Sequence, residues 1–167
     1  IPLRKYRSYI HAELTGGVKS DSIGTNIFAA VFSGNNVIDE YLQAGNGSSG
    51  FGWNIDYGVG TRYTYTAENA SLIDLHLRGE SSGLRFYSPD TKSPGVKTTY
   101  IGLIGSGQDA FDLTELVEPD SRNMVVLENS VYLLKLNSAN YVKIWITKIN
   151  PAASGKNYRT VEFKYKI

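Results

Sequence analysis

The sequence predicts an all-β protein, an antiparallel β-sandwich or a jelly-roll-like fold, with one short helix near residues 108–118. The C-terminal residues alternate strictly between apolar and polar side chains, which is the period of a strand with one buried face. About ten short apolar or alternating runs are separated by turn-forming residues. Glycine and proline are spread evenly, without a domain boundary. The sequence therefore predicts one domain over residues 1–167, with residues 1–7 as an N-terminal arm.

The N-terminal third of the chain predicts short strands joined by polar linkers. Residues 8–14 alternate weakly and fit a first strand, whereas residues 18–26 are polar. Residues 27–32 (IFAAVF) are too short for a typical helix and are typical of a strand covered on both faces. Residues 37–43 fit a strand better than a helical turn, and the glycine- and serine-rich residues 45–50 predict a loop.

Residues 51–67 carry an aromatic alternation. Apolar side chains, most of them aromatic, occupy every odd position from Phe51 to Val59, and small or polar residues occupy the even positions. Thr61 and Arg62 are expected to turn the chain. The apolar side is expected to be core, while the bare glycine side requires another backbone, a bulge or a ligand close to it.

The middle of the chain predicts three more strands and the helix. Residues 72–78 alternate, with aliphatic side chains on one face and a polar face that is expected to be wet. Residues 84–87 and 97–104 predict further strands. Residues 106–118 are the best helix candidate, because they carry a short apolar face and Pro119 follows to stop the helix. The polar face of the first of these strands carries a row of three side chains: Asp74, His76 and Arg78.

The final 40 residues predict a three-stranded meander that begins after a small apolar strand at residues 124–127. A hairpin folded symmetrically about Ser138 and Ala139 pairs aliphatic residues on its core face, Val131 with Ile146 and Leu133 with Ile144. A slip of one residue would exchange the faces. The last strand is expected to bury Val161, Phe163, Tyr165 and Ile167. The opposite face of the hairpin is mixed and is expected to carry six side chains: Tyr132, Leu134, Leu136, Tyr141, Lys143 and Trp145.

This mixed face is the predicted recognition surface. Aromatic rings with polar tips can stack on a sugar while their tips stay wet, so Trp145, Tyr141, Tyr132 and Lys143 are the candidate ligand-binding residues for a glycan or a peptide. The alternative is a face half-buried under a loop or a second sheet. The polar row from Asp74 to Arg78 could bind a small anionic or hydroxylated ligand, or could be a solvated, charge-complementary face. Four other aromatic residues could also stack on a sugar, Trp53, Tyr57, Tyr63 and Tyr65, but the strand from Phe51 to Tyr57 is expected to be core.

Composition excludes several function classes. The 17 basic and 16 acidic side chains leave a formal net charge of +1, which argues against a nucleic-acid binder. The absence of cysteine excludes a disulfide scaffold, a zinc–thiolate site and a cysteine nucleophile. No apolar run is long enough for a transmembrane helix. The chain opens on Ile1 rather than methionine, which is consistent with a processed product from which an export signal has been removed.

Metal, haem and catalytic motifs are weak. The only histidines, His11 and His76, are far apart in sequence and could serve as haem ligands only if the fold joined them. Carboxylates at Asp39 and Glu40, or at Asp109, Asp112 and Glu115, do not match a calcium-binding loop. The sequence contains no nucleophile elbow and no phosphate-binding loop, and paired carboxylates for glycoside hydrolysis stay open. We therefore predict no metal site, no cofactor and no catalytic residue.

Three segments carry a resemblance to a known group of proteins: residues 73–90 (IDLHLRGESSGLRFYSPD), residues 131–149 (VYLLKLNSANYVKIWITKI) and residues 160–167 (TVEFKYKI). They resemble exported β-rich lipoproteins of Bacteroidetes-type bacteria, in which an Asp precedes an apolar strand, a Ser-Pro loop follows, and a lysine- and aromatic-rich meander ends the chain. The haem-binding HmuY-like proteins are the functionally known members. The resemblance covers about half of the chain, and that group's haem-ligand histidines have no match assigned at His11 or His76.

Three functions follow as hypotheses. The leading one is a non-enzymatic ligand-binding or adhesion domain for a glycan or a peptide. By the resemblance it would be extracellular, periplasmic or at the cell surface, with a lipid anchor outside the present sequence. The second hypothesis is a haem or metal carrier that uses His76. The third is a carbohydrate-active enzyme with paired carboxylates.

Overall fold

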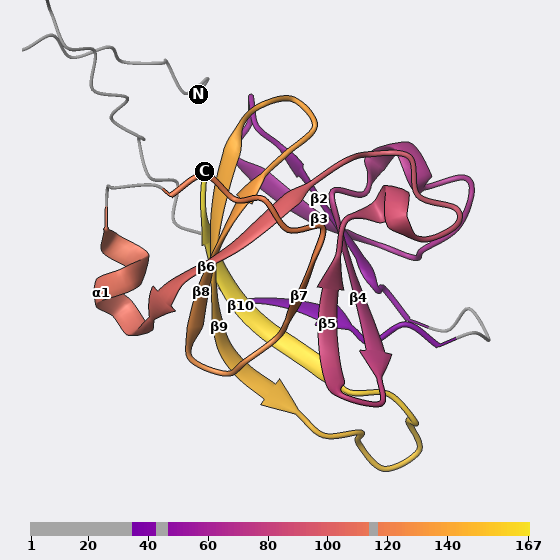
Figure 1. Ribbon diagram of the computed structural model, residues 1–167. Helices are drawn as coiled ribbons and strands as arrows, with labels where there is room; N and C mark the ends of the chain where they lie inside the picture. Colours follow the sequence, from indigo (N-terminus) through magenta and orange to yellow (C-terminus); the bar gives the residue numbers. More distant parts are fainter. Residues whose placement is uncertain (1–34, 43–46, 114–116) are drawn as a thin grey trace, which may run out of the picture. The chain divides into compact units, whose positions relative to one another are not determined.

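The structure is a computed structural model that describes residues 35–42, 47–113 and 117–167. The predicted arm at residues 1–7 and the predicted strands at residues 8–14 and 27–32 lie outside these ranges. Within them the chain forms two antiparallel five-stranded sheets and one short α-helix (Figure 1). The predicted all-β sandwich is therefore confirmed for the described residues.

The first sheet is built around the C-terminal meander, in the order β1-β10-β9-β8-β6. Its five strands are β1 (Asn36–Asp39), β10 (Thr160–Lys166), β9 (Tyr141–Asn150), β8 (Ser130–Lys135) and β6 (Tyr100–Ser106). The helix α1 (Gly107–Asp112) follows β6 directly and packs on the outer face of this sheet, against Val131 and Trp145.

The second sheet has the order β3-β2-β4-β5-β7. Its five strands are β3 (Val59–Tyr63), β2 (Gly50–Asn54), β4 (Leu75–Glu80), β5 (Gly83–Tyr87) and β7 (Asn123–Val125). Two single-turn 3₁₀ helices lie in its connections, η1 (Ala70–Leu72) before β4 and η2 (Pro89–Thr91) after β5.

The core lies between the facing sides of the two sheets. Alternate residues of β9 and β10, including Ile144, Ile146 and Phe163, point into it and are fully buried. Phe51 of β2 meets Phe163 edge-on, with 5.0 Å between ring centroids, which is a preferred geometry for an aromatic pair. The period-2 pattern therefore places the buried faces of the last two strands as the sequence predicts, with Trp145 on the opposite face from Ile144 and Ile146.

The predicted register of the β8–β9 hairpin is wrong by one residue. Tyr132 pairs with Ile144 and Leu134 with Val142, because the turn holds three residues rather than two. Ala139 adopts the left-handed conformation (φ 59°) that closes such a three-residue loop. The slip turns Tyr132 and Leu134 into the core, where both are fully buried.

Two other predicted boundaries differ from the structure. The aromatic segment turns at residues 55–58, where Gly58 has φ 67°, and not at Thr61 and Arg62, which lie within β3. Tyr57 consequently lies at the tip of the β2–β3 hairpin and is 73% exposed instead of forming core. The helix ends at Asp112, because Leu113 is already extended, so it is shorter than the predicted 108–118.

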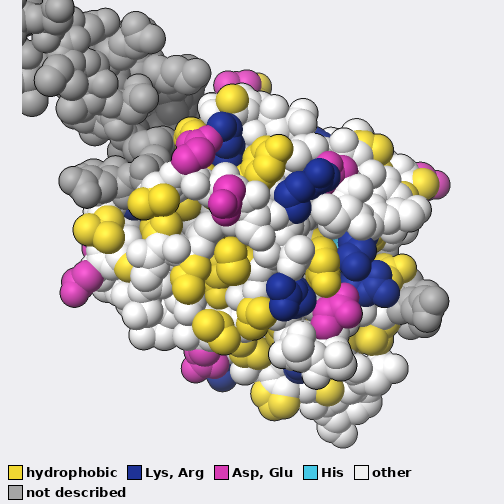
Figure 2. Space-filling view, viewed as in Figure 1, with side chains coloured by type: hydrophobic (Ala, Val, Ile, Leu, Met, Phe, Trp, Pro, Cys, Tyr) yellow, Lys and Arg dark blue, Asp and Glu magenta, His cyan; other side chains and the backbone are white. Residues whose placement is uncertain are grey.

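The described surface mixes residue types. Figure 2 shows lysine and arginine side chains beside aspartate and glutamate on one face, with hydrophobic patches between them. Among the residues described, no helix has the length and apolar character that crossing a membrane requires.

Candidate functional site

A groove opens at one end of the second sheet, where β2 separates from β4. The two strands pair only at Gly50–His76 and Phe51–Leu75; the chain before β4 then diverges into η1. The turn between β8 and β9 forms the opposite wall. Figure 1 shows this turn, in orange, at the same end of the molecule as the β2–β3 hairpin, in purple. The cavity has a volume of about 430 Å³, which lies within the range of small-molecule sites.

The lining of this groove comes from four chain segments. The β2–β3 hairpin supplies half of it, and Leu72 with Asp74, Lys97 and the β8–β9 turn supply the rest. The lining residues that matter for ligand chemistry are Trp53, Asn54, Asp56, Tyr63, Asp74, Lys97, Asn137, Ser138 and Asn140. Sequence reasoning selected only Asp74 from this set as a site residue.

Asp74 holds the groove open. Its backbone N–H donates to the carbonyl of Phe51 (2.9 Å), and its carboxylate Oδ2 accepts the backbone N–H of Trp53 (2.8 Å). The carboxylate therefore takes the place of the next β4 carbonyl in the ladder, which allows β2 and the chain before β4 to separate without leaving a buried donor unpaired. Its other oxygen, Oδ1, lies 3.0 Å from Lys97 Nζ.

Gly52 allows the backbone of η1 to come close to β2. A Cβ at this position would lie 1.9 Å from the carbonyl oxygen of Leu72, so only glycine allows η1 to pack on this face of β2. The sequence pattern indicated such an approach, because a bare strand face implies a neighbouring backbone or ligand. The close backbone is the explanation found at Gly52.

Trp53 is a lining residue of the groove and also belongs to the core between the sheets. Its ring packs 4.9 Å from Phe51 and 6.0 Å from Tyr165, measured between centroids, and only 7% of the residue is exposed. The indole N–H has no hydrogen-bond partner within the described residues. A buried unpaired donor is uncommon and calls for an explanation.

The rim of the groove is rich in side-chain amides. Asn54 belongs to one wall, and Asn137 and Asn140 belong to the other. Asn54 Oδ1 accepts the backbone N–H of Tyr57 (3.3 Å), and Asn140 Nδ2 donates to Ser138 Oγ (2.9 Å), so both amides also fix their turns. Asn137 is exposed at the tip of its turn, where its amide faces solvent.

The predicted recognition surface around Trp145 is occupied by the protein itself. Trp145 is half-buried; its indole Nε1 donates to Asn129 Oδ1 (3.2 Å), and its ring centroid lies 5.8 Å from that of Phe111 in α1. Tyr141 donates its hydroxyl to Glu118 Oε2 (2.5 Å). Tyr132 is not on this surface at all, because it is in the core with 0% exposure.

Two lysines on the same face hold the end of α1. Lys143 and Lys166 lie opposite each other on β9 and β10, and both donate to the carbonyl of Phe111. Lys143 also donates to the carbonyl of Leu113. Cations are favourable at the carboxyl end of a helix. Burial, together with the nearby Lys166, lowers the pKa of Lys143. These contacts give the face a structural role in docking the helix.

The predicted polar row does not form one wet surface. Asp74 lies in the groove and is buried, and Arg78 is half-buried on the outer face of the second sheet. His76 is 0% exposed, stacked on Tyr65 with 3.8 Å between ring centroids and an 11° angle between their planes. A covering layer of aromatic side chains therefore replaces the expected solvent.

His76 is a neutral core histidine. Its Nδ1 lies 3.2 Å from the carbonyl oxygen of Ser49, and burial lowers its pKa to about 4. The Nε2 atom has no partner among the described residues, but a haem iron could reach it only if the Tyr65 cover opened. His11, the second candidate ligand, lies outside the described residues.

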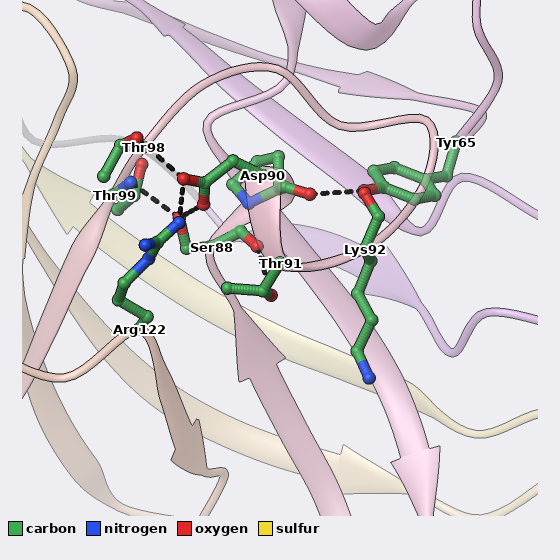
Figure 3. A network of polar contacts seen from close by, with 9 residues as sticks. Tyr65, Ser88, Asp90, Thr91, Lys92, Thr98, Thr99 and Arg122 are labelled. Atoms are coloured by element: carbon green, nitrogen blue, oxygen red, sulfur yellow. Dashed lines mark hydrogen bonds and ion pairs between the residues drawn. The ribbon is translucent and has the colours of Figure 1, made fainter.

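A polar network after β5 has a structural explanation. Ser88 Oγ donates to Asp90 Oδ1 (2.5 Å) and accepts the backbone N–H of Thr99 (2.8 Å), while Thr98 and Arg122 bind Asp90 Oδ2 (Figure 3). Both carboxylate oxygens are used, and no histidine of the described residues takes part in this network to activate the serine. The network anchors residues 88–99 to the second sheet.

Three of the five carboxylates considered for calcium are engaged by cations. Asp39 pairs with Arg62 (2.8 Å), Glu40 with Arg159 (2.8 Å), and Asp112 with Lys166. Across residues 35–42, 47–113 and 117–167, no group of three or more acidic or histidine side chains is arranged to hold a metal ion. Glu115 is not among the residues that the structure describes.

Comparison with known proteins does not assign this site. No protein-family model matches the chain, and neither a curated protein nor a solved structure matches it.

Proposed function

We propose that this protein is a non-enzymatic glycan-binding β-sandwich and that the groove beside Trp53 is its binding site. The observation that supports this proposal is the lining: two aromatic residues, Trp53 and Tyr63, share one cavity of about 430 Å³ with asparagine residues from two walls. The predicted ligand class is retained, while the predicted site at Trp145 is replaced.

The amides match the chemistry of a sugar. A side-chain amide offers one acceptor and two donor hydrogens, and a sugar hydroxyl both donates and accepts. Asn54, Asn137 and Asn140 can therefore bind hydroxyl groups in either sense. Tyr63 is half-buried, so part of its ring and its hydroxyl can meet a ligand. An extended peptide would instead need unpaired backbone groups along a strand edge.

The surroundings of the two carboxylates in the groove favour a binding protein over a glycosidase. A glycosidase needs one carboxyl group that gives up a proton and a second that acts as a base or nucleophile. Both oxygens of Asp74 are already used, one by the Trp53 N–H and one by Lys97. Asp56, the other acid of the lining, is exposed at the hairpin turn. A glycosidase is the competing proposal, and release of reducing sugar from a bound oligosaccharide would establish it.

An exported location is part of the proposal. It is supported by the resemblance of residues 73–90, 131–149 and 160–167 to exported β-rich lipoproteins. Fractionation of the native host, with an antibody against the domain, should place the protein outside the cytosol; a cytosolic pool alone would contradict this part.

The test is binding to an array of neutral oligosaccharides, followed by calorimetry with those retained. Asn137→Ala removes an exposed amide from the groove and should weaken binding by about tenfold, the loss of one to two hydrogen bonds. Asn157→Ala is the matched control, because Asn157 is exposed in the loop between β9 and β10. The proposal fails if no array member binds, or if both variants bind as the wild type does.

A further inference from the structure

The positive charge in the lining of the groove is already paired within the protein. Three charged residues are found in its lining: Asp56, Asp74 and Lys97. Lys97 Nζ lies 3.0 Å from Asp74 Oδ1, where the Asp74 side chain is 4% exposed and that of Lys97 is 27% exposed. The one cation among the described lining residues is thus committed to a buried carboxylate, and the remaining acid, Asp56, is exposed on the neighbouring wall.

The Asp74–Lys97 pair resists being opened by a ligand. An anionic group that drew Lys97 away would leave the Asp74 carboxylate buried without its cation, and the loss of one partner of a buried pair is strongly unfavourable. The anion would also approach Asp56, and like charges brought together at an interface oppose binding. An uncharged hydroxyl group meets neither penalty and can still bind the amides of the rim.

We infer that the groove selects uncharged sugars and rejects their uronic-acid and sulfated counterparts. This inference rests on the proposed glycan-binding function and narrows it to one ligand class. Asp74 sets the selectivity, because it neutralises Lys97 while its second oxygen fixes the Trp53 backbone at 2.8 Å. Asp56 adds a smaller, solvent-screened repulsion.

The inference predicts a change of specificity on removing one charge. In Asp74→Asn the amide oxygen can still accept the Trp53 N–H, but Lys97 loses its counter-ion and becomes a free cation in the groove. This variant should bind acidic sugars better and neutral sugars about as before. Lys97→Met should not gain acidic binding, because it removes the cation itself.

The experiment uses an array in which each neutral oligosaccharide is printed beside its uronic-acid and O-sulfated counterparts. The wild type should prefer the neutral member by about tenfold, because an acidic member finds Lys97 already paired with Asp74 and also approaches Asp56. Asp74→Asn should reduce this preference by at least about tenfold at low salt. If Asp74→Asn does not fold, Asp56→Asn tests the same charge effect at an exposed site, with a smaller gain in acidic binding. Asp120→Asn, an exposed acid outside the lining, is its control.

Each outcome decides a separate point. Acidic members that bind the wild type as tightly as neutral ones would overturn the selectivity while leaving glycan binding intact. A preference that changes equally in Asp56→Asn and Asp120→Asn would reflect net charge and would also overturn it. An array on which the wild type binds nothing would overturn the proposed function itself.

Discussion

The two tryptophans of this chain lie in contrasting surroundings. Trp145 projects from the outer face of the first sheet, and its indole N–H is bound by Asn129. Trp53 belongs to the core, and its indole N–H has no partner in the described part of the chain, although the residue is part of the lining of an open groove. The more exposed tryptophan is therefore the one whose polar group is already satisfied. Exposure of an aromatic residue alone is a poor indicator of a binding site.

The same contrast extends to the polar neighbours. Around Trp145 the lysines and Tyr141 bind carbonyls of α1 and the Glu118 carboxylate. Around Trp53 a cavity is lined by asparagines from both walls; the amides of Asn54 and Asn140 also fix their turns, and Asn137 is exposed. A surface whose groups are paired within the protein offers little to a ligand, whereas unfilled space lined by polar groups can bind one.

The largest expected effect is a difference in stability between alanine variants of the two tryptophans. Trp53→Ala should lower the free energy of unfolding by about 3–5 kcal/mol, because it leaves a cavity beside Phe51 and Tyr165. Trp145→Ala should cost about 1–2 kcal/mol, because that ring is only half-buried and lies under a short helix. Urea unfolding followed by circular dichroism measures both. Equal losses would remove the distinction between a core ring and a surface ring.

The histidine buried on the outer face of the second sheet, His76, should make the stability of the protein depend on pH. The pKa of His76 is lowered to about 4 by burial, with Arg78 and Lys92 nearby and Tyr65 and Tyr41 packed on the ring. Between pH 6.5 and 4 the unfolded chain binds the proton and the folded chain does not, so stability falls as the pH falls through this window.

From pH 7 to pH 5 the free energy of unfolding should fall by about 2 kcal/mol because of His76. Urea titrations at both pH values should show the loss in the wild type and a smaller loss in His76→Phe. A wild type whose stability has the same pH dependence as His76→Phe would mean that His76 is accessible to protons in the folded state.

The smallest expected effect is at Lys143. Lys143→Met removes one cation from the carboxyl end of α1 and should lower stability by less than about 1 kcal/mol. It should leave glycan binding unchanged, because Lys143 is not part of the groove lining. Calorimetry of this variant beside Asn137→Ala compares the two surfaces directly. If Lys143→Met weakened glycan binding and Asn137→Ala did not, the binding site would lie on the face around Trp145 and not in the groove.

The sequence predicts the sheets better than the site, for a physical reason. A period of two residues fixes which side chains share a face, so the buried sides of β9 and β10 follow from the alternation of Ile144, Ile146, Val161 and Phe163. Register depends on the turn, and the left-handed conformation of Ala139 has no strong signal in an alanine. One extra loop residue therefore moved Tyr132 from the predicted binding surface to the core.

The groove could not be found from the sequence, because it depends on distant segments that meet in space. Asp74 and Lys97 are 23 residues apart, and the β8–β9 turn that faces them comes much later in the chain. Only two local signals point to it: an Asp directly before an apolar strand and a glycine opposite an aromatic side. Neither signal predicts that the asparagines of the β8–β9 turn lie on the other wall.

Ligand-dependent fluorescence of the two single-tryptophan variants tests the central claim most directly. Trp145→Phe retains only Trp53, and Trp53→Phe retains only Trp145. A neutral oligosaccharide retained by the array should change the emission of Trp53 in a saturable way and leave that of Trp145 unchanged. Saturable change at Trp145 with a silent Trp53 would contradict the account and place the ligand on the outer face of the first sheet.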